Sequence, residues 1–475
     1  MEKNLNLPGN PRYQPEQLKP ILGYDNLYRS WGEIEIAKLE VMKEIGKIPA
    51  AVWEQLTEEH RLAILGITTS ETDGVERKIT KHDVNAHNRL MKEVLPPELA
   101  IYIHMPLTSY DKISNGYVMM FRDAFQQVIK PAAKELIGHL ADLTETFATT
   151  TQIGRTHGQQ ALPITVGFWF ATLLYRITYN YSELRNNCEK LKGKISGATG
   201  AYNAQVALGF DDDKTGKSFE EMVLHKLNLK PAPISTQILC PEAVAYFLFS
   251  ATMLSAALAQ FGRDGRQLMR TEIGEIIESF GAGQVGSSTM AHKRNPINFE
   301  NTEGMWLKNK NEFGKVMDTL ISEHQRDLVN SSVMRDYPII LVNLAYQLNT
   351  LLRKDQSGEP FVKRIKVDTE CLQNNLSLNA NLIMAEPIYI SLQLAGYSQD
   401  AHELVNRILT PMAKTSGLTI IYHLEEMAKN NQDISGALEK IPDELKNLFR
   451  NPELYTGKAA TKAFEIAAWA RKKIA

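Results

Sequence analysis

Residues 243–261 form a run of nineteen residues without a charge, and this run restricts the fold more than any other segment. Its apolar side chains step by three and four, as one face of an α-helix does: Val244, Leu248, Ala251, Leu254, Leu258 and Phe261. The run is long enough to span a membrane, but four polar residues and six alanines dilute it. We therefore expect a helix that is buried on all sides inside a bundle, and no membrane association.

Helical periodicity also dominates elsewhere, and alternating strand patterns are scarce. Residues 116–150, 167–194 and 302–352 predict further long helices, the first containing Pro131 and the last interrupted near residues 336–338. Prolines divide the two ends of the chain into shorter segments. The pattern predicts an all-α protein in three parts, which are an N-terminal helical cap (residues 1–115), a central long-helix bundle (116–360) and a C-terminal helical cap (361–475).

The overall composition is that of an ordinary folded protein. The formal net charge of −2 argues against a general nucleic-acid surface. The three cysteines lie far apart without C-x-x-C spacing, which fits a reducing compartment and excludes a cysteine zinc site. The first residues lack the apolar core of a signal peptide, so we expect a cytoplasmic protein.

Common catalytic motifs are missing from the sequence. It contains no phosphate-binding G-x-x-x-x-G-K-[ST] loop, no G-x-S-x-G elbow and no H-E-x-x-H pair, so acid/base chemistry without a cofactor or metal stays open. Four polar clusters stand out, at residues 81–83, 103–111, 154–159 and 286–296, the last followed by residues 324–335. Taken singly, each is more typical of a helix cap or a solvated turn than of a site. In a bundle, however, distant clusters can converge on one cleft.

Residues 286–296 read GSSTMAHKRNP and follow a glycine-rich stretch. They resemble the signature loop of the fumarase/aspartase superfamily, G-S-S-x-M-P-x-K-x-N-P. Within that superfamily, the chain is most similar to the adenylosuccinate lyase family at RTHGQ (155–159), TQI (236–238) and QRDL with SSVMR (325–335). Arg12 and Tyr13 also fit. The matches cover nearly the whole chain in the right order.

The resemblance implies β-elimination of fumarate from adenylosuccinate, which gives AMP, and from the succinylated aminoimidazole carboxamide ribotide of purine biosynthesis. It implies a fumarase/aspartase-like central bundle, a homotetramer that shares its active sites between subunits, and no cofactor or metal. A serine on the mobile loop would remove a proton beside a carboxylate, and a histidine would protonate the leaving nitrogen.

The resemblance also assigns roles to individual residues. Ser287 is implied as the base, His157 as the acid, Glu300 as its orienting carboxylate, and Lys293 as a cation near Ser287 that also holds a substrate carboxylate. Five residues are implied to bind the substrate phosphate, a group that the paired N–H donors of arginine suit. They are Arg12, Tyr13, Arg326, Ser331 and Arg335. Further substrate contacts are implied for Lys81, His82, Asp83, Thr108, Ser109, Gln237, Ser288, Asn295, Asn301 and Ser332.

Two positions depart from the family pattern. Ala291 stands where proline is usual, which removes a fixed backbone angle from the loop. Lys81 stands where arginine or asparagine is expected. Two other interpretations stay open: another superfamily lyase or a carboxymuconate-type cycloisomerase, neither of which needs a phosphate clamp, and a superfamily member retained as a structural or binding protein.

Overall fold

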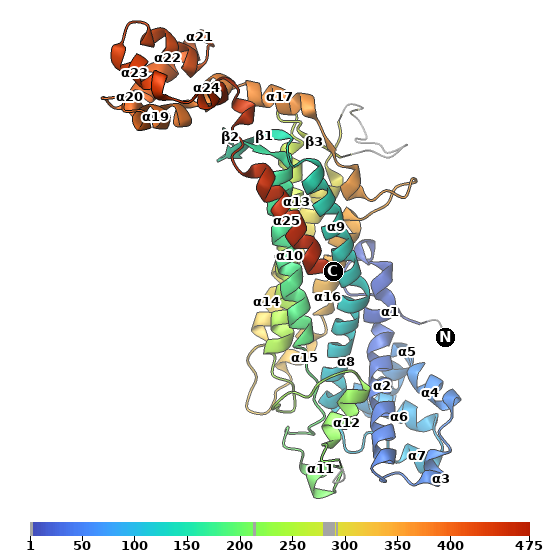
Figure 1. The fold of residues 1–475 in the computed structure, drawn as a ribbon. Coiled ribbons are helices and arrows are strands. Elements are labelled where there is room, and N and C mark those ends of the chain that lie inside the picture. The colour runs from blue at the N-terminus through green and yellow to red at the C-terminus, as the bar shows by residue number, and fades with distance from the viewer. Residues whose placement is uncertain (1–2, 212–214, 279–289, 291–292) are drawn as a thin grey trace. The chain divides into compact units, whose positions relative to one another are not determined.

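The computed structural model describes residues 3–211, 215–278, 290 and 293–475, and its described chain is mostly helical (Figure 1). The prediction of an all-α fold is confirmed. The chain forms two compact units. Unit 1 contains residues 1–135, 179–260 and 301–352, and unit 2 contains residues 136–178, 261–300 and 353–475. Four of the five unit borders fall within helices, which are α9 (Lys130–Thr146), α10 (Val166–Glu189), α13 (Glu242–Leu268) and α14 (Ile297–Asp318), and the fifth lies between residues 352 and 353. The predicted three-part division at residues 115 and 360 stays a prediction.

The other elements of unit 1 are helices and helical turns: η1 (Pro11–Tyr13), η2 (Glu16–Leu18), α1 (Lys19–Leu22), α2 (Tyr24–Glu44), α3 (Ala50–Trp53), α4 (Glu58–Leu65), α5 (Thr69–Val75), η3 (Glu76–Thr80), α6 (Asp83–Glu93), α7 (Pro97–Ala100), α8 (Ser109–Ala124), η4 (Phe125–Ile129), α11 (Asn203–Ala207), α12 (Phe219–Lys226), α15 (Val329–Met334) and α16 (Pro338–Leu351).

Helix α2 packs along α8 and provides much of the core of unit 1. Trp31 of α2 is fully buried, and α8 carries Gly116 opposite it. A Cβ atom at position 116 would lie 3.1 Å from the Trp31 ring, so glycine permits this close approach. The sequence predicted only short segments before residue 115, whereas α2 has 21 residues.

Helix α13 confirms the helix predicted from the uncharged run. It has 27 residues, and five of the six periodic side chains are fully buried: Leu248, Ala251, Leu254, Leu258 and Phe261. The helix is long and apolar enough to cross a membrane, but 67% of its most apolar window is buried inside the protein. This burial is what the core helix of a soluble bundle shows.

Of the other predicted long segments, 167–194 is confirmed by α10, which runs without a break to Glu189, whereas the remaining two are helical but interrupted. Helix α8 continues through the π-helical turn η4 into α9, and the N–H of Lys130 donates to the carbonyl of Phe125, five residues earlier. Pro131 follows at once and has no N–H to continue an α-helical pattern, which accounts for the irregularity there. Residues 302–352 contain longer breaks than predicted, because α14 ends at Asp318 and α15 begins only at Val329.

The elements of unit 2, apart from the shared helices, are β1 (Thr151–Thr156), β2 (Gln159–Thr165), β3 (Ile276–Ile277), η5 (Phe361–Arg364), β4 (Lys366–Val367), α17 (Thr369–Ser377), α18 (Ala380–Ile383), α19 (Ala385–Leu394), α20 (Ala401–Glu403), η6 (Leu404–Leu409), α21 (Thr410–Ser416), α22 (Ile420–Ala428), α23 (Gln432–Lys440), α24 (Asp443–Arg450), η7 (Pro452–Leu454) and α25 (Ala459–Ile474).

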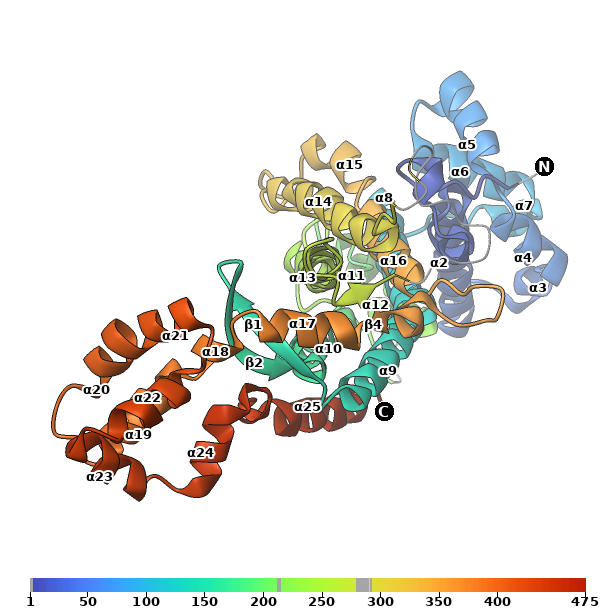
Figure 2. The same ribbon diagram turned by 90° about the horizontal axis from the view of Figure 1, so that it is seen from above.

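Strands β1 and β2 form an antiparallel hairpin that the sequence did not predict, and α17 packs against β1 (Figure 2). Strands β3 and β4 form a second small antiparallel pair. Ile153 of β1 joins the apolar core of the short C-terminal helices, where Ile388, Leu409 and Leu424 are fully buried. This contact packs the hairpin against the C-terminal helices of unit 2.

Candidate active site

A cavity of about 280 Å³ lies in unit 1, and many of the predicted substrate-binding residues line it. Every lining residue belongs to unit 1. The charged and polar lining residues are Glu76, Lys81, His82, Asp83, Ser109, Tyr110, Tyr117, Arg326, Ser331 and Arg335, and the apolar ones are Leu27, Trp31, Ile113, Leu328 and Met334. These residues come from α2, from the start of η3, from the start of α6 and the two residues before it, from α8, and from α15 with its flanking residues.

Arg326 is held on several sides. Its Nη1 donates to Oε1 of Gln237 (2.7 Å), its Nη2 to Oγ of Ser331 (3.2 Å), and its Nε to the carbonyl of Asp327 (3.2 Å). The ring of Tyr110 lies against the guanidinium, with its centroid 3.7 Å from Cζ. A cation stacked on an aromatic face and bonded at three nitrogens is a preorganised anion donor.

Arg335 is paired with a carboxylate in the same cavity. Its Nη2 donates to Oδ2 of Asp83 at 2.6 Å, and Nδ1 of His82 lies 3.4 Å from the other oxygen of Asp83. Burial alone would lower the pKa of Arg335, but the hydrogen bond and charge of Asp83, together with Tyr117 and Tyr28, outweigh burial, and the pKa is raised overall. Arg335 therefore stays cationic, and Asp83 connects it to His82.

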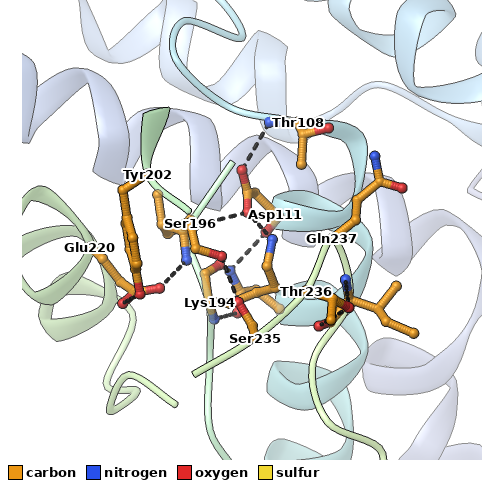
Figure 3. A network of polar contacts seen from close by, with 12 residues as sticks. Thr108, Asp111, Lys194, Ser196, Tyr202, Glu220, Ser235, Thr236 and Gln237 are labelled. Carbon is orange, nitrogen blue, oxygen red and sulfur yellow. Dashed lines mark hydrogen bonds and ion pairs between the residues drawn. The ribbon is translucent and has the colours of Figure 1, made fainter. Parts of the chain in front are cut away.

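The first turn of α8 is anchored by buried polar contacts (Figure 3). The carboxylate of Asp111 accepts hydrogen bonds from the backbone N–H groups of Thr108 (2.8 Å) and Ser196 (3.2 Å), and it pairs with the buried ammonium of Lys194. These contacts fix the backbone that presents Ser109 and Tyr110 to the cavity.

The next residue along α8, Lys112, is also buried. It lies 2.8 Å from Oε1 of Glu35, and Lys38 lies 2.8 Å from the other oxygen of that carboxylate. Burial lowers the pKa of Lys112 to about 8, although Glu35 opposes this shift. The two lysines hold the pKa of Glu35 well below its ordinary value despite its burial. This cluster ties α8 to α2.

Some of the predicted residues of unit 1 lie outside the cavity lining. Tyr13 packs edge-on against Tyr346 (5.1 Å between ring centroids), and the ammonium of Lys308 lies 5.0 Å from its ring centre. Arg12 precedes it and is exposed. Thr108, Gln237, Asn301 and Ser332 do not line the cavity, although Gln237 bonds to Arg326.

In unit 2, His157 occupies the two-residue turn between β1 and β2. Its backbone φ is +53°, and that of the following Gly158 is +76°. A left-handed conformation is uncommon for a residue with a side chain, and such positions occur often in functional sites. The turn places an exposed imidazole at the tip of a hairpin.

The start of α14 carries the other described candidates of unit 2. Lys293 and Asn295 precede the helix, and Glu300 is exposed in its first turn. The carboxylate of Glu278 accepts bonds from Nδ2 of Asn298 (3.1 Å) and from the N–H of Phe299 (3.0 Å), so it caps this helix. Ser287 and Ser288 lie outside the described residues.

Sequence reasoning missed several residues of the cavity. Tyr110 lay within the flagged cluster 103–111 but was not selected, because an aromatic residue between Ser109 and Asp111 gives no sign of stacking on Arg326. Trp31, Tyr117 and Met334 belong to helical faces that are typical of a core. Among the described residues, no group of three or more His, Cys, Asp or Glu is placed to hold a metal ion.

The chain is similar along nearly its whole length to adenylosuccinate lyases. It is 33% identical to the adenylosuccinate lyase of Pyrococcus horikoshii over 94% of both chains. It is 30% identical to that of Methanocaldococcus jannaschii, over 96% of this chain and 94% of that protein. The adenylosuccinate lyase of Archaeoglobus fulgidus is also 30% identical, over 96% and 97%.

Solved structures share the fold. The 3-carboxy-cis,cis-muconate lactonizing enzyme from Pseudomonas putida superposes with a TM-score of 0.78 at 21% identity over 98% of both chains. A fumarate lyase from Mesorhizobium sp. BNC1 superposes with a TM-score of 0.79 at 19% identity, over 97% of this chain and 100% of that one. Residues 25–308 match the family described as lyase. The chain therefore belongs to this lyase family of the fumarase/aspartase superfamily, together with the adenylosuccinate lyases.

Proposed function

We propose that this protein cleaves adenylosuccinate to AMP and fumarate, and acts in the same way on the succinylated aminoimidazole carboxamide ribotide. The observation that carries the proposal is the cavity of unit 1, in which Arg326, Arg335 and Ser331 lie together. Two arginines and a hydroxyl suit a phosphate group. The identity to curated adenylosuccinate lyases over nearly the full length supports the same substrate.

The reaction removes a proton from the carbon beside a carboxylate and breaks a C–N bond. Ser287 is the proposed base and His157 the proposed acid for the leaving nitrogen, with Glu300 orienting His157. Charge builds up on the substrate carboxylate as the proton leaves, so nearby cations and donors lower the barrier. Lys293 and Asn295 are the proposed partners of the succinyl carboxylates.

The remaining contacts complete the proposed substrate site. Thr108, Ser109 and Gln237 would hydrogen-bond the succinyl part, and His82 and Asp83 would orient the substrate. The further proposed substrate contacts are Arg12, Tyr13, Lys81, Ser288, Asn301 and Ser332.

We infer further that the protein acts as a cytoplasmic homotetramer with active sites shared between subunits. Exposed apolar side chains on two helices, Tyr246 and Phe249 of α13 and Leu307 of α14, support an interface there. The described catalytic candidates His157, Lys293 and Glu300 do not line the cavity of unit 1, and a site assembled from several chains would supply them. Sedimentation would test this, since an active monomer would contradict it.

The substrate assignment is tested by turnover. Purified protein should release fumarate and AMP in equal amounts from adenylosuccinate, and it should act poorly on argininosuccinate and 3-carboxymuconate, which carry no phosphate. Faster turnover of either of these two would favour the alternative lyase or cycloisomerase function. Binding of AMP without any turnover would favour a retained binding protein.

A further inference from the structure

The phenol of Tyr110 contacts two groups of the cavity at once. Its ring lies against the guanidinium of Arg326, 3.7 Å from Cζ to the ring centre, and its hydroxyl lies 2.9 Å from Oγ of Ser331. Tyr110 is only 4% exposed, so these contacts occur where water competes little. Its backbone is fixed by the neighbouring Asp111, which binds Lys194 and Ser196.

Ser331 is hydrogen-bonded to both Arg326 and Tyr110, and the direction of the bond from Arg326 is fixed by its chemistry. A guanidinium can only donate, so Ser331 accepts the bond from Nη2 of Arg326. If the hydroxyl of Tyr110 also donates to Ser331, both lone pairs of Oγ are used and the hydroxyl hydrogen of Ser331 remains available to a ligand. Ser331 then acts as a donor, which an anionic oxygen requires.

Arg326 is restricted in a similar way. Its bonds to Gln237, Ser331 and Asp327 use one N–H on each nitrogen, which leaves at most one N–H on each terminal nitrogen for a ligand. The ring of Tyr110, stacked on the guanidinium, fixes the orientation of the guanidinium plane. Preorganised donors bind more tightly because less conformational freedom is lost when the ligand arrives.

We propose that Tyr110 is a positioning residue that orients Arg326 and Ser331 as paired donors to the phosphate of the substrate. This proposal deepens the proposed function and rests on it for the identity of the phosphate ligand. Tyr110 itself does not touch the reacting atoms. Because Tyr110 contributes to substrate binding and not to the chemical step, replacing it should raise KM and leave kcat nearly unchanged.

The test compares Y110F, S331A and the double variant in steady-state kinetics with adenylosuccinate. Y110F keeps the ring and loses only the hydroxyl. We expect it to raise KM about tenfold with kcat within about twofold of the parent. If Tyr110 acts through Ser331, the double variant should be no worse than S331A by more than about twofold. Y110L also removes the stacked ring and should raise KM further.

A matched control is Y397F, which alters a buried tyrosine among the C-terminal helices of unit 2 and should leave both constants unchanged. An unchanged KM in Y110F, or losses that multiply in the double variant, would overturn the proposal. If the parent fails to cleave adenylosuccinate, the proposed function fails instead. Calorimetric binding of inorganic phosphate then tests Tyr110 separately, because Y110F should bind it more weakly than the parent, and equal binding would overturn the proposal.

Discussion

Arg155 donates to both carboxylate oxygens of Glu275, at 2.7 Å from Nη2 and 3.1 Å from Nη1, and Glu275 is fully buried. Gln152 and Asn375 each donate to the same carboxylate at 2.8 Å. The carboxylate thus joins the β1–β2 hairpin and α17 to the segment that leads into β3. Arg155 belongs to the RTHGQ segment. Its bonds to Glu275 fix the end of β1, and they thereby support the turn that carries His157.

Replacing Arg155 with methionine should therefore destabilise the protein strongly. The variant leaves a buried carboxylate without its cation, which costs about 3–5 kcal/mol. Urea unfolding of R155M and the parent measures this loss. The control is R471M, because Arg471 pairs with Asp142 and Glu145 at the surface and should contribute about 1 kcal/mol or less. Equal losses in the two variants would contradict the structural role.

Because the backbone at His157 is left-handed, substitutions there should affect stability and activity differently. A glycine there removes the strain that alanine keeps, so H157G should be more stable than H157A by about 1 kcal/mol. Both variants lack the imidazole and should lose about 10²–10⁴-fold in kcat, the usual contribution of a general acid. Urea unfolding and fumarate release measure the two effects. Parent-like turnover by H157G would rule out His157 as the acid.

The cap of α14 should respond to pH. Burial raises the pKa of Glu278 from 4.5 to about 6, although bonds from Phe299 and Asn298 partly oppose this. The native state therefore binds this proton more tightly than the unfolded state. Its contribution to stability is fully present below pH 4.5 and is lost as pH rises through about 6.

Substituting glutamine for Glu278 should remove that dependence. Relative to the parent, the unfolding free energy of E278Q should rise by about 2 kcal/mol between about pH 4.5 and about pH 7. Denaturant unfolding at several pH values measures this difference. A difference between E278Q and the parent that does not change with pH would show that Glu278 titrates normally.

The buried cluster of Glu35, Lys38 and Lys112 should be sensitive to the loss of one member. K112M removes one of two cations from a fully buried carboxylate, and we expect a loss of about 3 kcal/mol in urea unfolding. The matched control is K429M, because Lys429 pairs with Glu426 at the surface and should contribute less than about 1 kcal/mol. A cost for K112M as small as that of the control would show that the cluster does not stabilise α8.

Helix α13 was predictable because its apolar residues repeat with the helical period over nineteen positions. The β1–β2 hairpin was not, because its strands lack alternation and its turn is His157–Gly158. The long α2 was also missed, because its buried face includes charged Glu35 and Lys38, whose burial depends on partners distant in sequence.

Several site residues could be selected from the sequence because motifs carried them, and the cavity gathers His82, Asp83, Ser109, Ser331 and Arg335. The role of Tyr110 could not be predicted, because the stacking on Arg326 joins residues more than two hundred positions apart. The roles assigned to Ser287, Lys293 and Glu300 stay predictions.

We propose that the cavity around Arg335 binds the phosphate of a substrate that this protein cleaves. The most direct measurement compares kcat/KM of the parent and R335M for adenylosuccinate and for its dephosphorylated nucleoside. The parent should prefer the phosphorylated substrate strongly, and R335M should lose about 10–100-fold on it, mainly through KM, with little change on the nucleoside. Equal losses on both substrates, or no preference by the parent, would show that Arg335 does not bind the substrate phosphate.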